Sequence, residues 1–384
     1  MAVETGYSKI VTSGSVFLYD TGDTVNSWKG APTTNLATFD VASAVFSTDT
    51  PGNLTQTANS TEATYQGRLS KKMTVGAGYW NAYIYNYNTG VSSTVFAVSY
   101  KVKLPGGAHP SSIIGGGYIY GSAGSFFPAP TFTSLGDGWY LATMLYSGTS
   151  MTLNSLTGMN GIGPGVFYIT DYQAEAKSFS TPFAGVAGTR STTQGMIDIV
   201  GGNTIDLANM SYGANNAISF DGTDDYISLG CVSNTIRAYN SSTEFIVNLP
   251  VYSGGQRAIL SYRSVNTMYI GKASGGIFVY YNTLNTPGYT VGNITNGTTA
   301  HIVVLCNADG NLLSVYINGT LAGSVTRTGW STTYNSTVSL GYDDGGTNEY
   351  MLGSMYLFKH YNRVLSSTEI QQNYNHYKTR FNLP

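Results

Sequence analysis

The chain has 384 residues, which is enough for two domains of ordinary size. Its formal net charge is −2 and only 10% of its residues are charged, against roughly 25% in a typical soluble domain, so it lacks the basic surface that nucleic-acid binding requires. Glycine (47 residues) and tyrosine (31 residues) are abundant and 42% of the chain is hydrophobic, which predicts an all-β protein of short strands and tight turns rather than disorder.

The beginning of the chain predicts neither secretion nor membrane insertion. Residues 1–10 have no basic segment followed by an apolar one, as a signal peptide would. No stretch approaches the roughly 18 apolar residues of a membrane span, so folding in a cytoplasm is expected. Residues 1–30 are predicted to be an N-terminal arm with one strand at 15–19. The arm would dock on another subunit or form an edge strand of the first domain.

Residues 31–185 are predicted to form a first β-sandwich of the jelly-roll type. Several short runs rich in aromatic and β-branched residues are separated by Gly and Pro turns. The clearest run, 94–104, alternates along its length. One face of this run carries Phe96, Val98, Tyr100 and Val102. This face is expected to point into the core.

Aromatic side chains are the candidates for sugar contact, because exposed Tyr and Trp faces stack on the apolar faces of pyranose rings. Alternate residues of a strand share one face, which groups three of the tyrosines in the first domain. The candidate glycan-binding residues are Trp80, Tyr83, Tyr85, Tyr87, Tyr280, Tyr281, Trp330 and Tyr334. Core packing is the alternative for each of them.

Residues 186–205 are mostly small and polar and are predicted to be a linker. Residues 206–384 are predicted to be a second sandwich. The pair Asp221 and Gly222 is expected to turn its opening hairpin, and the pairs at 309–310 and 318–319 are candidates for type I′ hairpin turns.

One short helix is predicted to close this second sandwich. Ser366 and Glu369 have the spacing of a capping box, in which each side chain bonds to the backbone amide of the other. The apolar residues that follow, Ile370, Tyr374, Tyr377 and Phe381, repeat at helical spacing.

The sequence shows no standard catalytic or metal motif. Its four histidines lack zinc-binding spacing, and no nucleophile elbow or phosphate-binding loop occurs. Two cysteines are too few for a disulfide scaffold. Cys306 lies in an apolar run and is expected to be buried, while a bridge to Cys231 stays open as an alternative.

Two groups of motifs resemble parts of known families. The pattern over 340–377, with the two successive hairpins at 301–323, resembles the laminin-G-like, concanavalin-like jelly roll found in many phage structural proteins. Four further motifs resemble tailed-phage proteins in which a carbohydrate-binding-module-like β-sandwich precedes such a domain. They lie at 27–36, 136–140, 168–183 and 188–191.

This resemblance implies a virion protein of a tailed phage, made in the host cytoplasm, and not an enzyme. A capsid decoration protein or head fibre with weak glycan adhesion is the first expectation, and a tail fibre or receptor-binding subunit is the alternative. The implied partners are other virion proteins, cell-surface glycans and further copies of the chain, as in the trimers common among such proteins. A structural protein without ligand affinity and a glycan hydrolase are the remaining hypotheses.

The resemblance also implies what the acidic residues would do. No cofactor is expected, but several laminin-G-like domains hold Ca²⁺ with loop carboxylates. The residues that would hold it here are Asp221, Asp224, Asp225, Asp343 and Asp344; solvated turns are the alternative. A retaining glycosidase would need two carboxylates roughly 5–5.5 Å apart, and the nearest pair in sequence is Asp171 and Glu175.

Overall fold

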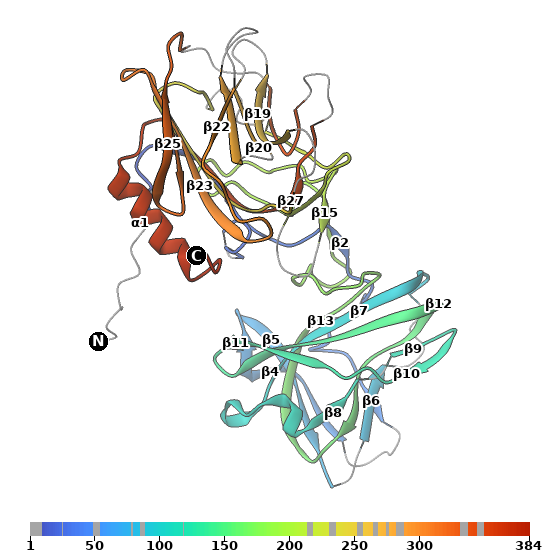
Figure 1. Cartoon of the computed structure of the whole chain (residues 1–384). Coiled ribbons are helices and arrows are strands. Elements are labelled where there is room, and N and C mark those ends of the chain that lie inside the picture. Colours follow the sequence, from blue (N-terminus) through green and yellow to red (C-terminus); the bar gives the residue numbers. More distant parts are fainter. Residues whose placement is uncertain are drawn as a thin grey trace, which may run out of the picture. The chain divides into compact units, whose positions relative to one another are not determined.

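The computed structural model consists of two compact units, both drawn in Figure 1. Residues 32–190 form one unit, called here the inserted unit. Residues 1–31 and 191–384 together form the other, called the discontinuous unit. The structure describes residues 10–24, 26–48, 54–77, 80–84, 89–117, 119–212, 218–229, 236–251, 256–263, 268–273, 276–281, 288–330, 337–343 and 349–384. None of the helices in these ranges is long and apolar enough to cross a membrane.

The first strand of the chain belongs to the C-terminal sandwich. Strand β1 (Ser15–Asp20) pairs antiparallel with β27 (Leu352–Tyr361) in the discontinuous unit. Phe17 is fully buried, and its ring centroid lies 5.4 Å from that of Phe358. The predicted strand at 15–19 therefore exists, but it is neither a free arm nor an edge strand of the first domain.

The segment predicted as a linker is packed in its second part. Residues 191–205 belong to the discontinuous unit, and the fully buried Asp198 organises them. Its carboxylate accepts from the amides of Leu18 (2.9 Å), Val200 (3.0 Å) and Gly201 (2.9 Å). These bonds tie residues 198–201 to β1, a long-range contact that the small polar composition did not reveal.

The discontinuous unit contains two antiparallel sheets. In the first sheet β1 and β16 pair with successive parts of the same edge of β27. Apart from β1, the spatial order of this sheet is β15 (Ser211–Tyr212), β16 (Ile218–Asp221), β27, β18 (Ser241–Asn248), β23 (Thr299–Asn307), β24 (Leu312–Ile317) and β25 (Thr320–Thr326). The second sheet has the order β17 (Ile227–Ser228), β26 (Thr337–Leu340), β19 (Arg257–Arg263), β20 (Met268–Ala273), β21 (Gly276–Tyr281) and β22 (Tyr289–Val291).

These two sheets face each other, and a helix covers the outer face of the first. Cys306 of β23 contacts Met268 of β20 with 3.8 Å between the sulfur atoms. On the other face, α1 (Ser367–Lys378) packs Ile370 into a cluster with Val303 of β23 and Tyr361 of β27. Figure 1 shows this helix alongside β23 and β25. Both faces of β18 and β23 are consequently buried.

The local signals at the C-terminus are confirmed. Ser366 accepts from the Glu369 amide at 3.3 Å, and the Glu369 carboxylate accepts from the Ser366 amide at 2.9 Å, which is the predicted capping box. Asn318 and Gly319 have φ values of 49° and 77°, as a type I′ turn requires. The turn predicted at 309–310 is wrong in detail, because the positive φ (49°) falls on Asn311.

The inserted unit is an antiparallel sandwich organised by one long strand, β12 (Trp139–Ile162). It pairs with β7 and β11 along its first part, and with β6, β8 and β9 along its second. The other strands are β2 (Thr33–Thr34), β3 (Ser47–Thr48), β4 (Leu54–Tyr65), β5 (Arg68–Val75), β6 (Trp80–Ile84), β7 (Ser92–Lys103), β8 (Ile114–Gly116), β9 (Ile119–Gly121), β10 (Gly124–Phe126), β11 (Thr131–Gly136), β13 (Gly165–Glu175) and β14 (Thr189–Arg190). Short 3₁₀ turns lie at Pro105–Gly107 and Pro110–Ser112.

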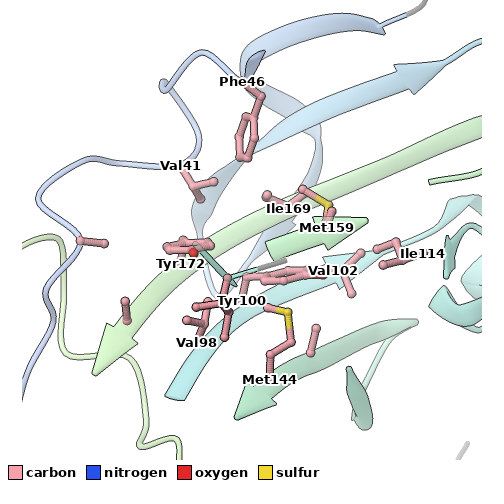
Figure 2. Packing of buried hydrophobic residues seen from close by; sticks show 14 of the residues in the cluster. Val41, Phe46, Val98, Tyr100, Val102, Ile114, Met144, Met159, Ile169 and Tyr172 are labelled. Carbon is pink, nitrogen blue, oxygen red and sulfur yellow. The ribbon is translucent and has the colours of Figure 1, made fainter. Parts of the chain in front are cut away.

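The predicted inward face of β7 is confirmed. Phe96, Val98, Tyr100 and Val102 are all at most 1% exposed and belong to one hydrophobic cluster. Figure 2 shows Tyr100 and Val102 in this cluster with Ile169 and Tyr172 of β13. The Tyr100 and Tyr172 rings stack with their centroids 6.2 Å apart. The all-β class with one closing helix is thus confirmed.

Candidate functional site

The loop between β16 and β17 joins the two sheets of the discontinuous unit, because β16 pairs with β27 and β17 pairs with β26. It is therefore not the hairpin predicted at Asp221 and Gly222. Gly222 does have a left-handed φ of 82°, but the strands on either side of it diverge into different sheets. Asp225 holds the loop by accepting from the Asp221 amide at 2.7 Å, and Asp221 accepts from the Thr223 amide at 2.7 Å.

This loop brings three predicted metal-ligating carboxylates together. One oxygen from each of Asp221, Asp224 and Asp225 lies within 4.8 Å of the others. Burial raises the pKa of Asp225, and the charges of Asp221 and Asp224 add to the effect, although hydrogen bonds from the Asp221 amide and the Ser211 hydroxyl oppose it. Three clustered carboxylates are the oxygen ligands that a hard cation prefers.

The two other predicted metal ligands are Asp343 and Asp344. Asp343 is 6% exposed, and its Oδ1 accepts from the Ser261 hydroxyl at 2.7 Å. Among the residues that the structure describes, it is not part of the three-carboxylate group. Asp344 lies outside the described residues.

Three half-buried tyrosines lie next to these acidic residues in sequence and contact one another. The ring centroids of Tyr226 and Tyr342 are 5.5 Å apart. Tyr342 stacks on Tyr350 with 4.5 Å between centroids and 20° between ring planes. Pairing of Ile227 with Leu340 brings the first two segments side by side. We call Asp221, Asp224, Asp225, Tyr226, Tyr342 and Tyr350 together the Asp–Tyr site.

Arg257 of β19 ties the two halves of the Asp–Tyr site together. Its Nη1 donates to the Gly222 carbonyl at 2.8 Å and to the Tyr350 carbonyl at 3.1 Å. One guanidinium thus connects the acidic loop to the segment that carries the last tyrosine. This linkage fixes the loop and the stacked rings relative to each other.

The aromatic residues predicted to contact glycans do not form this site. Trp330 is half-buried, and its indole Nε1 donates to the Arg327 carbonyl at 2.9 Å, so it stabilises the segment after β25. The backbone positions of the next group are in strands β6 and β21, but their side chains are outside the described residues; they are Trp80, Tyr83, Tyr280 and Tyr281. Tyr85, Tyr87 and Tyr334 lie outside the described residues altogether.

Sequence reasoning missed the three tyrosines of the Asp–Tyr site, although a signal was present. Tyr226 directly follows Asp225, Tyr342 directly precedes Asp343, and Tyr350 directly follows a glutamate. Each tyrosine is therefore adjacent to a loop carboxylate. The prediction instead followed aromatic alternation within strands, which selects positions on sheet faces rather than at loop junctions.

The two carboxylates considered for glycosidic catalysis have structural partners. Asp171 of β13 accepts from Arg68 at 2.6 and 2.5 Å and from Lys101 at 2.5 Å. Glu175 is fully buried and accepts from the hydroxyls of Thr33 (2.5 Å) and Thr181 (2.6 Å). Both side chains therefore stabilise the inserted unit.

Cys306 is buried and free, as the apolar run around it predicted. Burial raises the pKa of its thiol to about 12, which makes it unreactive at neutral pH. Cys231, its alternative bridging partner, lies outside the described residues.

The family comparison concerns the discontinuous unit. Residues 221–371 match a laminin G family model described as the concanavalin A-like lectin/glucanases superfamily. With the two facing sheets described above, this match identifies the C-terminal part of the chain as a concanavalin A-like jelly roll. The Asp–Tyr site lies at the start of the matched region and near its end. No curated protein sequence shows significant similarity to the chain.

Several solved structures share a general likeness of fold. The CBM40 module of the Ruminococcus gnavus IT-sialidase bound to α2,3-sialyllactose is 12% identical, with a TM-score of 0.35; the match covers 40% of this chain and 94% of that one. The Trypanosoma rangeli sialidase is 18% identical with a TM-score of 0.38, over 48% of this chain and 31% of that one. The botulinum neurotoxin serotype D binding domain is 16% identical with a TM-score of 0.37, over 48% and 50%. The match thus covers half or less of the length of the sialidase and of the neurotoxin domain.

Proposed function

We propose that this protein is a structural protein on the surface of a tailed-phage virion and that its concanavalin A-like unit binds glycans through the Asp–Tyr site. The observation that carries the glycan proposal is the contact of half-buried Tyr226 with the stacked pair Tyr342 and Tyr350, next to a carboxylate cluster in the same loop as Tyr226, on a lectin-type fold. The virion proposal is supported by the order of sequence motifs and by the low charge of the chain.

The chemistry of the Asp–Tyr site suits a sugar. A pyranose ring has one apolar face, which packs against an aromatic ring, and hydroxyls around its edge, which donate to carboxylates. Asp221 and Asp224 are exposed acceptors on the loop that leads into Tyr226. Tyr342 stacks on Tyr350, whose backbone carbonyl accepts a hydrogen bond from Arg257. This arrangement holds the Tyr342 ring in place, so little side-chain entropy is lost on binding.

We propose binding rather than hydrolysis. A retaining glycosidase needs one carboxylate as nucleophile and a second as acid, both facing the bond to be cleaved. In the inserted unit, Arg68 and Lys101 neutralise Asp171, and Glu175 is fully buried. In the Asp–Tyr site the carboxylates are arranged as a compact cluster, which suits a cation or a hydroxyl rather than in-line attack.

Calcium is proposed to bind to the carboxylates of Asp221, Asp224 and Asp225. The cluster supplies three of the six to eight oxygens that Ca²⁺ takes, and carbonyls and water would supply the rest. A cation there would offset the repulsion that contributes to the raised pKa of Asp225. Calcium would then raise the midpoint of thermal unfolding in a concentration-dependent way, and Asp224→Asn should abolish that rise.

A glycan-binding assay with one matched control tests the Asp–Tyr site. Purified full-length protein is applied to an array of bacterial surface glycans, and hits are measured by calorimetry. Tyr342→Ala should weaken binding about tenfold, because an aromatic contact contributes roughly 1–1.5 kcal/mol. Tyr239→Ala, which removes another half-buried tyrosine of the same unit, should leave the affinity unchanged. Equal affinity of wild type and Tyr342→Ala would refute the site.

Imaging of the intact particle tests the virion assignment. Density for this chain at regular capsid positions would support a decoration protein or head fibre, whose many copies would compensate for weak individual contacts. Density at the tail tip would instead support a receptor-binding subunit. Absence of the chain from purified particles would overturn the virion proposal. Light scattering on the purified protein would separately test the expected homo-oligomer.

A further inference from the structure

The inserted unit contains a cavity of about 220 Å³ that lies outside the Asp–Tyr site. It is lined by residues from the segment before β3, from β4 and β5, from β13 and from the segment after it. Charged and aromatic side chains predominate among them, including Phe39, Asp40, Arg68, Asp171 and Phe183. All of them belong to the inserted unit, so the cavity is a property of that unit alone.

A β-bulge in β13 builds the polar wall of the cavity. The pairing of β13 with β7 shifts between Thr170 and Gln173, and Asp171, within the bulge, has a left-handed φ of 52°. Bulges re-aim side chains and are common next to binding sites. Here the bulge places the Asp171 carboxylate against Arg68 and Lys101.

The guanidinium of Arg68 is held rigidly, but not all of its N–H groups donate a hydrogen bond. Its Nε and Nη2 donate to Asp171 at 2.6 and 2.5 Å. Its Cζ lies 5.6 Å from the Tyr65 ring centroid and 5.8 Å from that of Phe183. The side chain is still 41% exposed, and within the described part of the chain its Nη1 makes no hydrogen bond. Arg68 therefore presents a fixed donor to the cavity.

Apolar side chains form the rest of the wall. Phe39 and Phe183 are half-buried, and Leu69 and Val186 are 38% and 45% exposed. Two exposed aliphatic side chains next to an ion pair make a surface that is apolar on one side and hydrogen-bonding on the other. A ligand that fits must have the same two-sided character.

One buried polar atom in the cavity wall lacks a partner. Tyr172 is 3% exposed, and its hydroxyl makes no hydrogen bond among the residues that the structure describes. Figure 2 shows this side chain with Val41, which also lines the cavity. This hydroxyl is shielded from the cavity as well as from solvent, so Tyr172 contributes to the apolar part of the wall.

We propose that this cavity binds one ring of a neutral sugar, as a second glycan site. Lys101, from behind the wall, neutralises Asp171 together with Arg68, and Asp40 is the other charged residue of the lining, so the wall has no excess of positive charge for an anion and little net charge for a cation. The volume of 220 Å³, compared with about 30 Å³ for each water in the liquid, has room for a single small ring. Sugar hydroxyls both donate and accept, so they can accept from Arg68 and donate to the exposed Asp40 while ring C–H groups contact Phe39 and Phe183.

This inference deepens the proposed glycan adhesion and rests on it. Two glycan sites on one chain would bind a polyvalent surface more tightly than either alone. The site is distinct in residues from the Asp–Tyr site, so the two can be removed separately.

Saturation-transfer NMR on the full-length protein tests the cavity, with glucose, galactose, mannose and N-acetylglucosamine as probes. In the Tyr342→Ala background, where the Asp–Tyr site is weakened, Val186→Trp places an indole in the cavity without touching its ion pair and should reduce transfer to the bound sugar at least fivefold. Leu145→Trp is the matched control, because Leu145 is 49% exposed in the same unit and does not line the cavity. It should leave the transfer unchanged. Arg68→Lys, which keeps the charge but loses the planar fork, should weaken it as well.

The Tyr342→Ala background separates this proposal from the proposed function. If Tyr342→Ala abolishes all transfer, the cavity proposal fails and the Asp–Tyr site stands. If transfer survives in Tyr342→Ala and is lost only with Val186→Trp, the cavity is the glycan site. Equal transfer in Val186→Trp and Leu145→Trp would overturn the proposal.

Discussion

Glu244 in the discontinuous unit and Asp171 in the inserted unit are both carboxylates surrounded by donors, yet only one of them is closed off from solvent. Glu244 is fully buried and accepts from His301 at 2.6 Å, from Asn373 at 2.9 Å and from Tyr361 at 3.0 Å. Asp171 is buried too, but its partner Arg68 is 41% exposed at the wall of a cavity.

The difference lies in what covers each cluster. The Asn373 side chain of α1 bonds directly to Glu244, and the Lys359 ammonium donates to the carbonyl of Val11. The helix and the start of the chain thus close the Glu244 cluster. No helix covers the Asp171 cluster in the described part of the inserted unit. A closed charge cluster stabilises the fold, whereas an open one retains donors for a ligand. Four predictions test this contrast.

The largest effect is expected for Glu244→Ala. Breaking a buried charged network by removing one partner costs about 3–5 kcal/mol, because His301, Asn373 and Tyr361 would lose their acceptor and the buried Lys359 would lose its neighbouring negative charge. Urea unfolding of the discontinuous unit would measure the loss. Asp309→Asn, which removes an exposed carboxylate of the same unit, is the control and should not change the free energy of unfolding. A loss as small as that of the control would mean that water reaches the Glu244 cluster.

The closed cluster should also make stability depend on alkaline pH. Burial lowers the pKa of Lys359 to about 8, with Arg363 adding to the effect and Glu244 and Asp20 opposing it. The folded protein therefore releases this proton first, and the unfolded state holds more protons between pH 8 and the ordinary lysine value of 10.5. Stability should rise with pH across that window, by on the order of 3 kcal/mol.

Urea unfolding at several pH values tests this dependence. Lys359→Met should remove the rise, whereas Lys378→Met, which changes an exposed lysine of α1, should retain it. A flat profile in the wild type would show that the Lys359 ammonium is solvated in the folded protein.

The open cluster should tolerate mutation better. Arg68→Gln is expected to cost only about 1 kcal/mol, because Arg68 is partly solvated and Lys101 still neutralises Asp171. The measurement is urea unfolding of the inserted unit, followed in parallel with sugar binding to the cavity. A loss as large as that for Glu244→Ala would show that both clusters are structural and remove the contrast.

The smallest effect is expected at the helix that closes the Glu244 cluster. Ser366→Ala removes the N-cap acceptor of α1, which typically costs about 0.5–1 kcal/mol. Hydrogen exchange should accelerate in the first turn of α1 more than in β23. Uniform acceleration across the unit would mean that the helix and the sheet open together rather than separately.

Features that depend on neighbouring residues were readable from the sequence. The capping box at Ser366 and Glu369, the apolar face of α1, the turn at Asn318 and Gly319 and the inward face of β7 all follow from spacing over a few residues. The three carboxylates at 221, 224 and 225 were found for the same reason, since they share one loop.

Only the tertiary structure decided which distant segments meet. Strand β1 pairs with β27, Asp198 anchors the segment predicted as a linker, and Tyr226 contacts Tyr342. Such contacts depend on strand register and on the complementarity of surfaces far apart in the chain, which local periodicity does not encode. The sequence by itself therefore determined the all-β class, the closing helix and the acidic loop. The folded sheets decided that the tyrosines join this loop and that a bulge opens a cavity beside Arg68, because side chains from different strands converge only after the strands have paired.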